Sequence, residues 1–152
     1  YAAHRDLHSF PSRRSSDLKR FSSYNGLLDR VIFHGHVDDE AALRFLYASA
    51  IASLSPGYAG LSITQSFGYG VPALISRDEP HAPEIVAAKE GSNCIFFETD
   101  DVQSLSDKMV DVYEDRGCWK LKGEEISRVC RDEYSVEAMV DGFCEAFGPT
   151  RR

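Results

Sequence analysis

The sequence predicts an α/β fold with a parallel sheet of about four strands, flanking helices and a helical C-terminal tail. Short β-rich apolar runs alternate with stretches of helical periodicity between residues 30 and 114, the pattern of strand–helix–strand units. Glycine or proline stands at several of their junctions, where chain reversals need special backbone geometry. Beyond residue 101 the apolar spacing is helical.

The expected elements follow from these patterns in chain order. Four β-rich runs predict strands at residues 30–33, 51–54, 72–75 and 93–97. Helical spacing predicts helices at residues 38–50, 62–69, 83–88, 102–114, 119–134 and 135–147. Acids at Asp38, Asp39 and Glu40 suit the positive end of a helix dipole. Either Asp100 or Asp101 is the expected N-cap of the helix at 102–114, and Ser135 that of the last.

The composition limits the function classes. The chain has 152 residues and a net charge of −7, and no apolar run approaches the length of a membrane span. Residues 1–20 hold five basic and two acidic residues, so the remainder has 12 basic and 22 acidic residues and a net charge of −10. An acidic domain without a basic stripe argues against nucleic acid as a partner.

The thiols and imidazoles give no metal motif. The four cysteines form no C-x-x-C pair, so free thiols in a reducing cytosol are expected. His34 and His36 would share one face of a strand, but no further ligands are placed near them. We therefore expect neither a metal site nor a cofactor.

Residues 8–18 resemble the translation of a short-read sequencing adapter. The adapter codons CGC TCT TCC GAT CT read Arg-Ser-Ser-Asp-Leu, as residues 14–18 do, and the bases before them read nearly as residues 8–13. A natural basic arm rich in serine and arginine is the alternative interpretation. We expect residues 1–20 to be an artefactual, disordered segment and residues 21–152 to form the folded domain, with the true upstream sequence missing.

Deleting residues 1–20 is expected to leave the melting temperature unchanged or raise it, because a segment outside the core buries no apolar surface. Thermal unfolding of the full chain and of a chain that begins at Phe21 measures this effect. A clear fall in the melting temperature of the shorter chain would show that the segment packs on the domain.

The most informative motif joins the second and third expected strands. Pro56-Gly57 follows the strand at 51–54, Gly60-Leu61 opens the next helix, and Gly70 with Pro72 closes it. The first N–H groups of a helix and the positive end of its dipole attract an anion. Glycine allows a phosphate or a sugar to approach the main chain closely. By spacing alone, an ordinary strand–loop–helix crossover explains the motif equally well.

The expected topology brings three loops to one edge of the sheet. In a parallel sheet flanked by helices, ligands bind at the carboxyl ends of the strands. The loops at residues 35–39, 56–61 and 76–83 all follow expected strands. The motif therefore lies where a ligand is expected.

Several segments, in this order, resemble the C-terminal half of the second Rossmann-type domain of a family 4 glycosyltransferase with the GT-B architecture. They are residues 31–37, 46–50, 56–72, 83–93 and 134–139, and the resemblance covers roughly residues 28–147. It implies a Rossmann-like sheet and a reaction in which a sugar moves from a nucleotide diphosphate-sugar to an acceptor hydroxyl, as in hexose transfer during polysaccharide biosynthesis.

The resemblance also implies the binding residues. Family members often carry two glutamates eight positions apart, one on the donor sugar and one on the ribose, and here Gly57 and Gln65 take these positions. Gln65 keeps an acceptor oxygen, whereas Gly57 has no side chain. For Gln65, an exposed polar position on a helix is the alternative. The implied nucleotide-sugar residues are Gly57, Tyr58, Ala59, Gly60, Leu61, Ser62 and Gln65, with a base-side loop at Val37 and Asp38.

Several groups of the family are missing from this sequence. Full members add an arginine and a lysine from the first half of the domain and an N-terminal acceptor domain. Arg77 and Lys89 are the nearest cations in the sequence, and we expect both to be solvated. For His81 we expect an ordinary loop histidine, with a role near the donor sugar as the alternative. The expectation is a fragment that is inactive alone, from a parent that is cytoplasmic or peripheral to a membrane. A non-catalytic α/β binding or interaction domain and another nucleotide-binding α/β enzyme are the alternatives.

Overall fold

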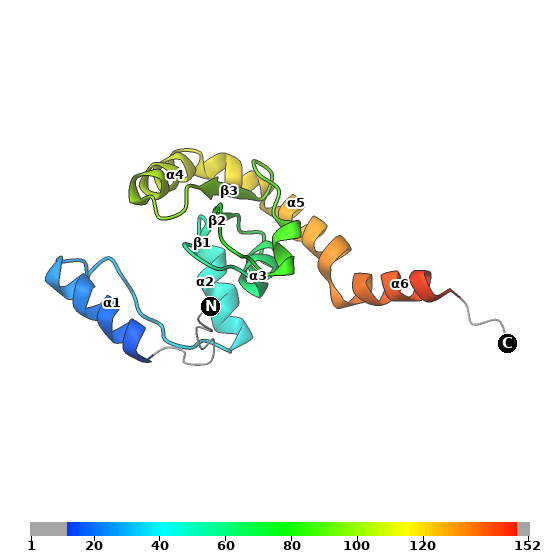
Figure 1. Cartoon of the computed structure of the whole chain (residues 1–152), viewed down its shortest axis with the longest axis horizontal. Coiled ribbons are helices and arrows are strands. Elements are labelled where there is room, and N and C mark those ends of the chain that lie inside the picture. The colour runs from blue at the N-terminus through cyan, green and yellow to red at the C-terminus, as the bar shows by residue number, and fades with distance from the viewer. Residues whose placement is uncertain (1–11, 149–152) are drawn as a thin grey trace, which may run out of the picture. The chain divides into compact units, whose positions relative to one another are not determined.

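A computed structural model describes residues 12–148, which belong to two units, residues 1–38 and 39–152. The described part of the first unit contains helix α1 (Ser12–Tyr24), followed by turns and an irregular stretch (Figure 1). The turns close through backbone bonds, of which one runs from the Leu27 N–H to the Ser22 carbonyl at 2.8 Å. The Lys19 ammonium lies 5.6 Å from the centre of the Phe33 ring.

The structure of the first unit differs from two expectations. Residues 12–20, expected to be disordered, are helical, while residues 1–11 lie outside the described residues. Residues 30–33, expected to form a strand, are irregular, and both Val31 and Ile32 are exposed. A helix forms its hydrogen bonds within itself, whereas a strand needs a neighbour. No strand in the described part of the chain pairs with residues 30–33, so their β propensity is not realised.

The second unit alternates helices and strands. Its elements are α2 (Glu40–Ser49), β1 (Ser53–Ser55), α3 (Leu61–Gly68), β2 (Ala73–Ser76), the 3₁₀ helix η1 (Pro83–Ala87), β3 (Cys94–Phe97), α4 (Val102–Glu114), α5 (Arg116–Tyr134) and α6 (Val136–Phe147). Side chains of Asp39, Asp101 and Ser135 cap α2, α4 and α6 by accepting backbone N–H bonds. The caps predicted at Asp101 and Ser135 are therefore confirmed, and Asp39, expected only to favour the helix dipole, is also a cap.

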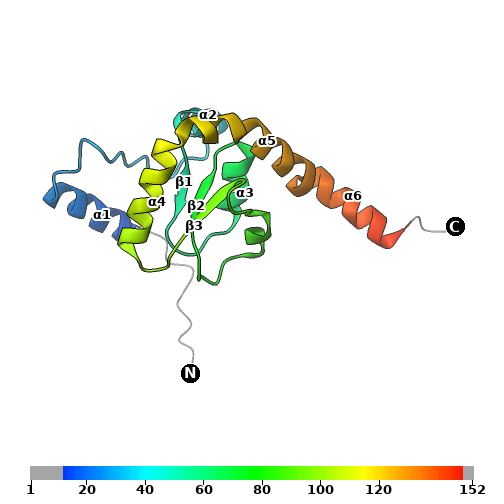
Figure 2. The ribbon, with the colours of Figure 1, turned by 90° about the horizontal axis from the view of Figure 1, so that it is seen from above.

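The sheet is parallel and has three strands in the order β1-β2-β3, one strand fewer than expected. Leu54 aligns with Leu74, and Leu74 aligns with Ile95. Because the strands follow chain order and parallel crossovers are right-handed, α3 and η1 lie on the same face. Figure 2 shows α4 on the opposite side of the strands from α3.

Both faces of the sheet are buried, which is typical of parallel sheets. Ala73, Ile75 and Cys94 belong to a core cluster with Ile63 and Phe67 of α3. Leu74 and Phe97 face the other way and pack with Val112 of α4. Helix α5 closes both layers, with Ile126 and Cys130 in the first and Trp119 in the second. Burial raises the pKa of the Cys94 thiol to about 12, so Cys94 packs as a neutral, small apolar residue.

The connection from α3 to β2 is close-packed against α5. Ser66 is fully buried, and its Oγ donates to the Val71 carbonyl and lies 2.8 Å from Ser53 Oγ. Gly70 has φ +75°, and a Cβ built on it would lie 2.6 Å from the Gly123 carbonyl oxygen of α5. Only glycine satisfies both the backbone angle and the close approach at this position.

Replacing Gly70 by alanine is therefore expected to destabilise the fold by about 1–3 kcal/mol, the usual cost of holding a non-glycine residue in a sparsely populated backbone region. Gly68→Ala is the matched control, because a Cβ there meets nothing within 4 Å. Denaturant unfolding of both variants measures the difference. Equal stability of the two variants would contradict the close contact between Gly70 and Gly123.

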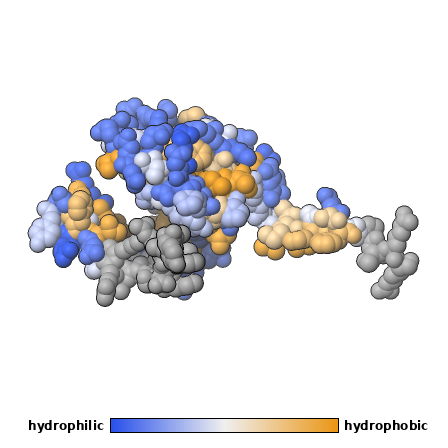
Figure 3. Space-filling model, viewed as in Figure 1, coloured by the Kyte–Doolittle hydropathy of each residue, from blue (hydrophilic) through white to orange (hydrophobic). Residues whose placement is uncertain are grey.

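The last helix carries an apolar surface. Val136, Met139, Val140, Phe143 and Phe147 of α6 are all exposed, and the face of α6 visible in Figure 3 is mostly apolar. These positions recur at helical spacing and share one side of the helix. Among the described residues, no helix is both long and apolar enough to cross a bilayer.

Candidate functional site

The loop that the sequence singled out lies at the carboxyl edge of the sheet, as predicted. Residues 56–60 leave the carboxyl end of β1 and lead into α3, and residues 77–82 leave the carboxyl end of β2 and lead into η1. Both loops are short, and the strands that they follow are parallel neighbours in the sheet. The structure therefore places these two loops at the same edge, where parallel sheets bind ligands.

The N-terminus of α3 is open. Gly60 is the N-cap and provides no side-chain bond, while its carbonyl accepts the Ile63 N–H at 2.9 Å. Among the described residues, no acceptor is bonded to the N–H groups of Leu61 and Ser62. Leu61 is 74% exposed. These main-chain donors at the positive end of the helix form a site suited to an anion.

Ala59 holds this loop in place and is only 1% exposed. Its N–H donates to His81 Nδ1 at 3.2 Å, and its carbonyl accepts the Ala82 N–H at 2.9 Å. His81 Nε2 in turn lies 2.7 Å from the Ser76 carbonyl at the end of β2. His81, expected to be an ordinary loop histidine, lies in the loop between β2 and η1, is partly buried and connects two loops to the sheet.

A carboxylate faces the same loop. A Cβ built on Gly60 would lie 3.3 Å from Ala82 Cβ, 3.7 Å from the Tyr58 ring and 3.9 Å from Glu84 Oε2. In the described part of the chain, Glu84 Oε2 is buried and has no hydrogen-bond partner. A buried polar atom normally has one, so this oxygen is an acceptor available to a nearby donor. Sequence reasoning missed the proximity, because nothing in the spacing relates residue 84 to residue 60.

Gln65 is exposed on α3. The Tyr47 hydroxyl donates to its Oε1 at 3.4 Å, and the Tyr47 ring stacks on Tyr69 with centroids 4.7 Å apart. Burial, followed by the charge of Tyr69, raises the pKa of Tyr47, so the hydroxyl remains a donor at neutral pH. Gln65 and Leu61 also border a groove of about 520 Å³ between α3 and α5, to which α5 contributes Arg131.

The other expected groups are placed as follows. Arg77 pairs with Glu90 at 3.4 Å and Glu98 at 3.2 Å, and it lies over the Phe96 ring. It is therefore occupied by carboxylates at the protein surface. Lys89 is exposed. Val37 and Asp38 end the first unit, and their assignment to the base-side loop stays a prediction. Over residues 12–148, no three histidine, cysteine or acidic side chains are arranged to hold a metal ion.

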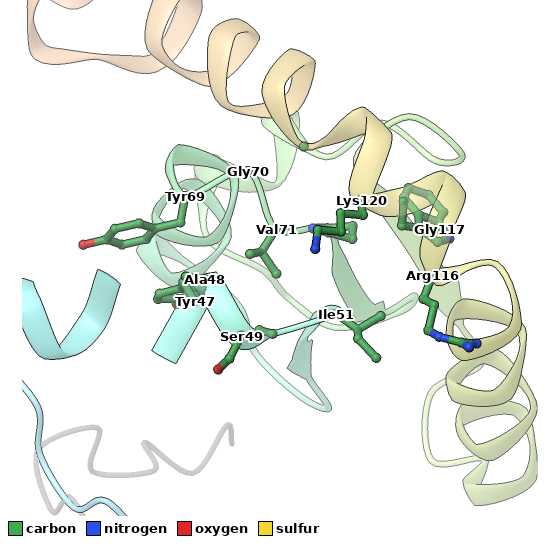
Figure 4. A pocket seen from close by; sticks show the side chains of 14 residues that line it. Tyr47, Ala48, Ser49, Ile51, Tyr69, Gly70, Val71, Arg116, Gly117 and Lys120 are labelled. Carbon is green, nitrogen blue, oxygen red and sulfur yellow. The ribbon is translucent and has the colours of Figure 1, made fainter. Parts of the chain in front are cut away.

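A larger hollow of about 560 Å³ lies at the other end of the strands. It is bordered by residues that precede β1 and β2, together with the start of α5 (Figure 4). The Arg116 guanidinium donates to the Tyr113 carbonyl and lies 4.5 Å from the centre of the Tyr113 ring, so its charge is directed toward α4. In Figure 4 Lys120 extends toward Val71. This hollow lies at the amino edge of the sheet, whereas ligands of parallel sheets bind at the carboxyl edge, so we place the candidate site at the carboxyl edge.

Comparison with known proteins agrees with the α/β architecture described above. Residues 9–115 match the family model described as glycosyl transferases group 1. The match covers more than half of the chain, so the chain belongs to the group 1 glycosyltransferases. A comparison with curated proteins found no significant match.

Solved structures show the same architecture. Sucrose-phosphate synthase from Thermosynechococcus elongatus superposes with a TM-score of 0.73 at 17% identity, covering 87% of this chain and 33% of its own. HepE from Anabaena, solved in complex with UDP, gives 0.70 at 17% identity, covering 87% of this chain and 36% of its own. The fold is thus part of the GT-B, Rossmann-like architecture predicted from the sequence, and the chain spans about a third of these proteins' length.

Proposed function

We propose that this chain contributes part of the donor site of a glycosyltransferase that moves a sugar from a nucleotide diphosphate-sugar to an acceptor hydroxyl. The observation that carries the proposal is the open N-terminus of α3, where the N–H groups of Leu61 and Ser62 lack acceptors in the described residues. Membership of the group 1 family supports it.

The chemistry assigned to the loop follows from its geometry. Transfer of the sugar leaves negative charge on the departing diphosphate, and donors already aimed at that charge stabilise the transition state. The main-chain groups of residues 60–62 supply such donors, and glycine at 57 and 60 lets the diphosphate approach. Gln65 offers the ribose an amide group next to Tyr47. Tyr58 and Ala59 complete the wall of the site in this proposal.

The site is proposed to be incomplete in this chain. In the described part of the chain, no contact places an arginine and lysine pair at the loop, and Arg77 is already held by two carboxylates. The parent enzyme, which we place in the cytoplasm, would supply these cations and the acceptor domain. Hydrolysis or transfer of a nucleotide-sugar by the 152-residue chain is therefore expected to be undetectable. A parent enzyme that includes the upstream sequence is expected to turn over the nucleotide-sugar. A coupled assay for release of nucleoside diphosphate measures this, and turnover by the short chain would contradict it.

One observation favours a second candidate function, a non-catalytic domain that binds nucleotides. Gly57 stands where the resemblance places the carboxylate that engages the donor sugar, and glycine has no side chain to replace it. A nucleotide would still bind at the α3 N-terminus under this alternative. Binding of a nucleotide-sugar by the parent protein without its turnover would favour the second candidate function.

Nucleotide binding is expected to be weak and to centre on residues 57–62 and 65. With main-chain donors alone, we expect a dissociation constant on the order of millimolar, or about −4 kcal/mol. Gly60→Val should abolish binding, because its Cβ would meet Ala82 at 3.3 Å and its methyl groups would fill the approach to the loop. Gln65→Ala should weaken binding of uridine diphosphate and leave inorganic phosphate unaffected, since only the former carries a ribose.

Chemical-shift titrations with uridine diphosphate and with phosphate measure these effects. Gly117→Val is the matched control, because a Cβ at Gly117 meets nothing within 4 Å and the residue lies at the other edge of the sheet. Circular dichroism of each variant confirms that it is folded. Identical titrations of the original chain and Gly60→Val, or shifts that map to the amino edge of the strands, would refute the placement of the site.

A further inference from the structure

The loop of the proposed site is held through the main chain of Ala59, and His81 is the side chain that contacts it. Ala59 receives one bond from the Ala82 N–H, which any residue at position 82 except proline can donate. The other bond runs from the Ala59 N–H to a ring nitrogen of His81. The second bond therefore depends on the identity of residue 81.

The two contacts of His81 fix the state of its ring. A backbone N–H only donates, so Nδ1, 3.2 Å from the Ala59 nitrogen, must be the unprotonated acceptor. A carbonyl oxygen only accepts, so Nε2, 2.7 Å from the Ser76 oxygen, must carry the hydrogen. His81 is thus a neutral imidazole that connects the loop to the carboxyl end of β2.

The anchor at β2 is itself fixed. Ser76 is fully buried, and its Oγ lies 2.7 Å from Thr99 Oγ1, which also accepts the Asp78 N–H at 2.9 Å. This arrangement links the ends of β2 and β3 to the start of the loop that carries His81. A displacement of the His81 ring would therefore move Ala59 relative to a rigid sheet edge.

We propose that His81 is a positioning residue for the donor loop: by accepting the Ala59 N–H it holds residues 57–60 so that the free N–H groups of Leu61 and Ser62 converge on the ligand. The part of the proposal that concerns the ligand rests on the function proposed above. The part that concerns the loop does not.

Two substitutions separate the two contacts. In His81→Asn, Oδ1 stands the same number of bonds from the backbone as Nδ1 and accepts from Ala59, but nothing reaches Ser76. In His81→Gln, Nε2 stands at the position of the histidine Nε2 and donates to Ser76, but no acceptor is placed at the Nδ1 position. Both variants keep a polar side chain of similar size, so they are informative even where His81→Ala unfolds. His34→Asn, which replaces an exposed histidine of the first unit, is the control.

The experiment has one readout without ligand and one with it. Hydrogen exchange of the Ala59 amide in the free chain is expected to be slow in the original protein, His34→Asn and His81→Asn, and about tenfold faster in His81→Gln. Titration with uridine diphosphate should give a dissociation constant within about twofold of the original for His81→Asn. For His81→Gln it should be roughly threefold to tenfold larger, the effect of one hydrogen bond.

The possible outcomes are distinguishable. Rescue by asparagine and not by glutamine supports the proposal, because general loss of packing would affect both variants. Equal Ala59 exchange in all chains, or rescue by glutamine alone, overturns it. If the original chain binds no uridine diphosphate, the proposed function fails, and the exchange readout still decides whether His81 positions the loop.

Discussion

The central strand β2 is the element on which the other placements depend. It is hydrogen-bonded on both sides, to β1 and β3, and all four of its residues are buried. Alternate side chains enter two different core clusters, so α3, η1 and α4 are each held against it from one side or the other. The loops after β1 and β2 at the carboxyl edge of the sheet are positioned by this strand, because the connecting segments are too short to adopt many paths.

The candidate site is built mainly from backbone. Free N–H groups at the start of α3, a glycine without a capping side chain and a buried alanine define it, and the polar side chains of His81 and Glu84 lie beside it. Recognition through main-chain groups depends on chain path more than on residue identity. Under the proposed function, residues 57 and 65 can therefore differ from the glutamates that the resemblance implies without loss of the main-chain donors.

Local patterns allowed most elements to be predicted, and non-local contacts set the limit. Periodicity and caps located α4 and α6 to within a residue, since Asp101 and Ser135 act within their own helix ends. Residues 30–33 were predicted wrongly as a strand, because a strand forms only with a partner and none is present among the described residues. The contacts of Ala59 with His81 and of Gln65 with Tyr47 join segments 22 and 18 positions apart. Hydrophobic spacing carries no information about such pairs.

The role of α5 bears on how the boundary of a folding unit is chosen. The family match ends at residue 115, and α5 begins at residue 116. Yet α5 supplies Trp119 to one core layer and Ile126 to the other, and its Gly123 lies against the turn before β2. A chain cut where the sequence family stops would keep every strand and lose the helix that covers both sides of the sheet. In this protein the segment that the family model matches is therefore smaller than the unit that can exclude water.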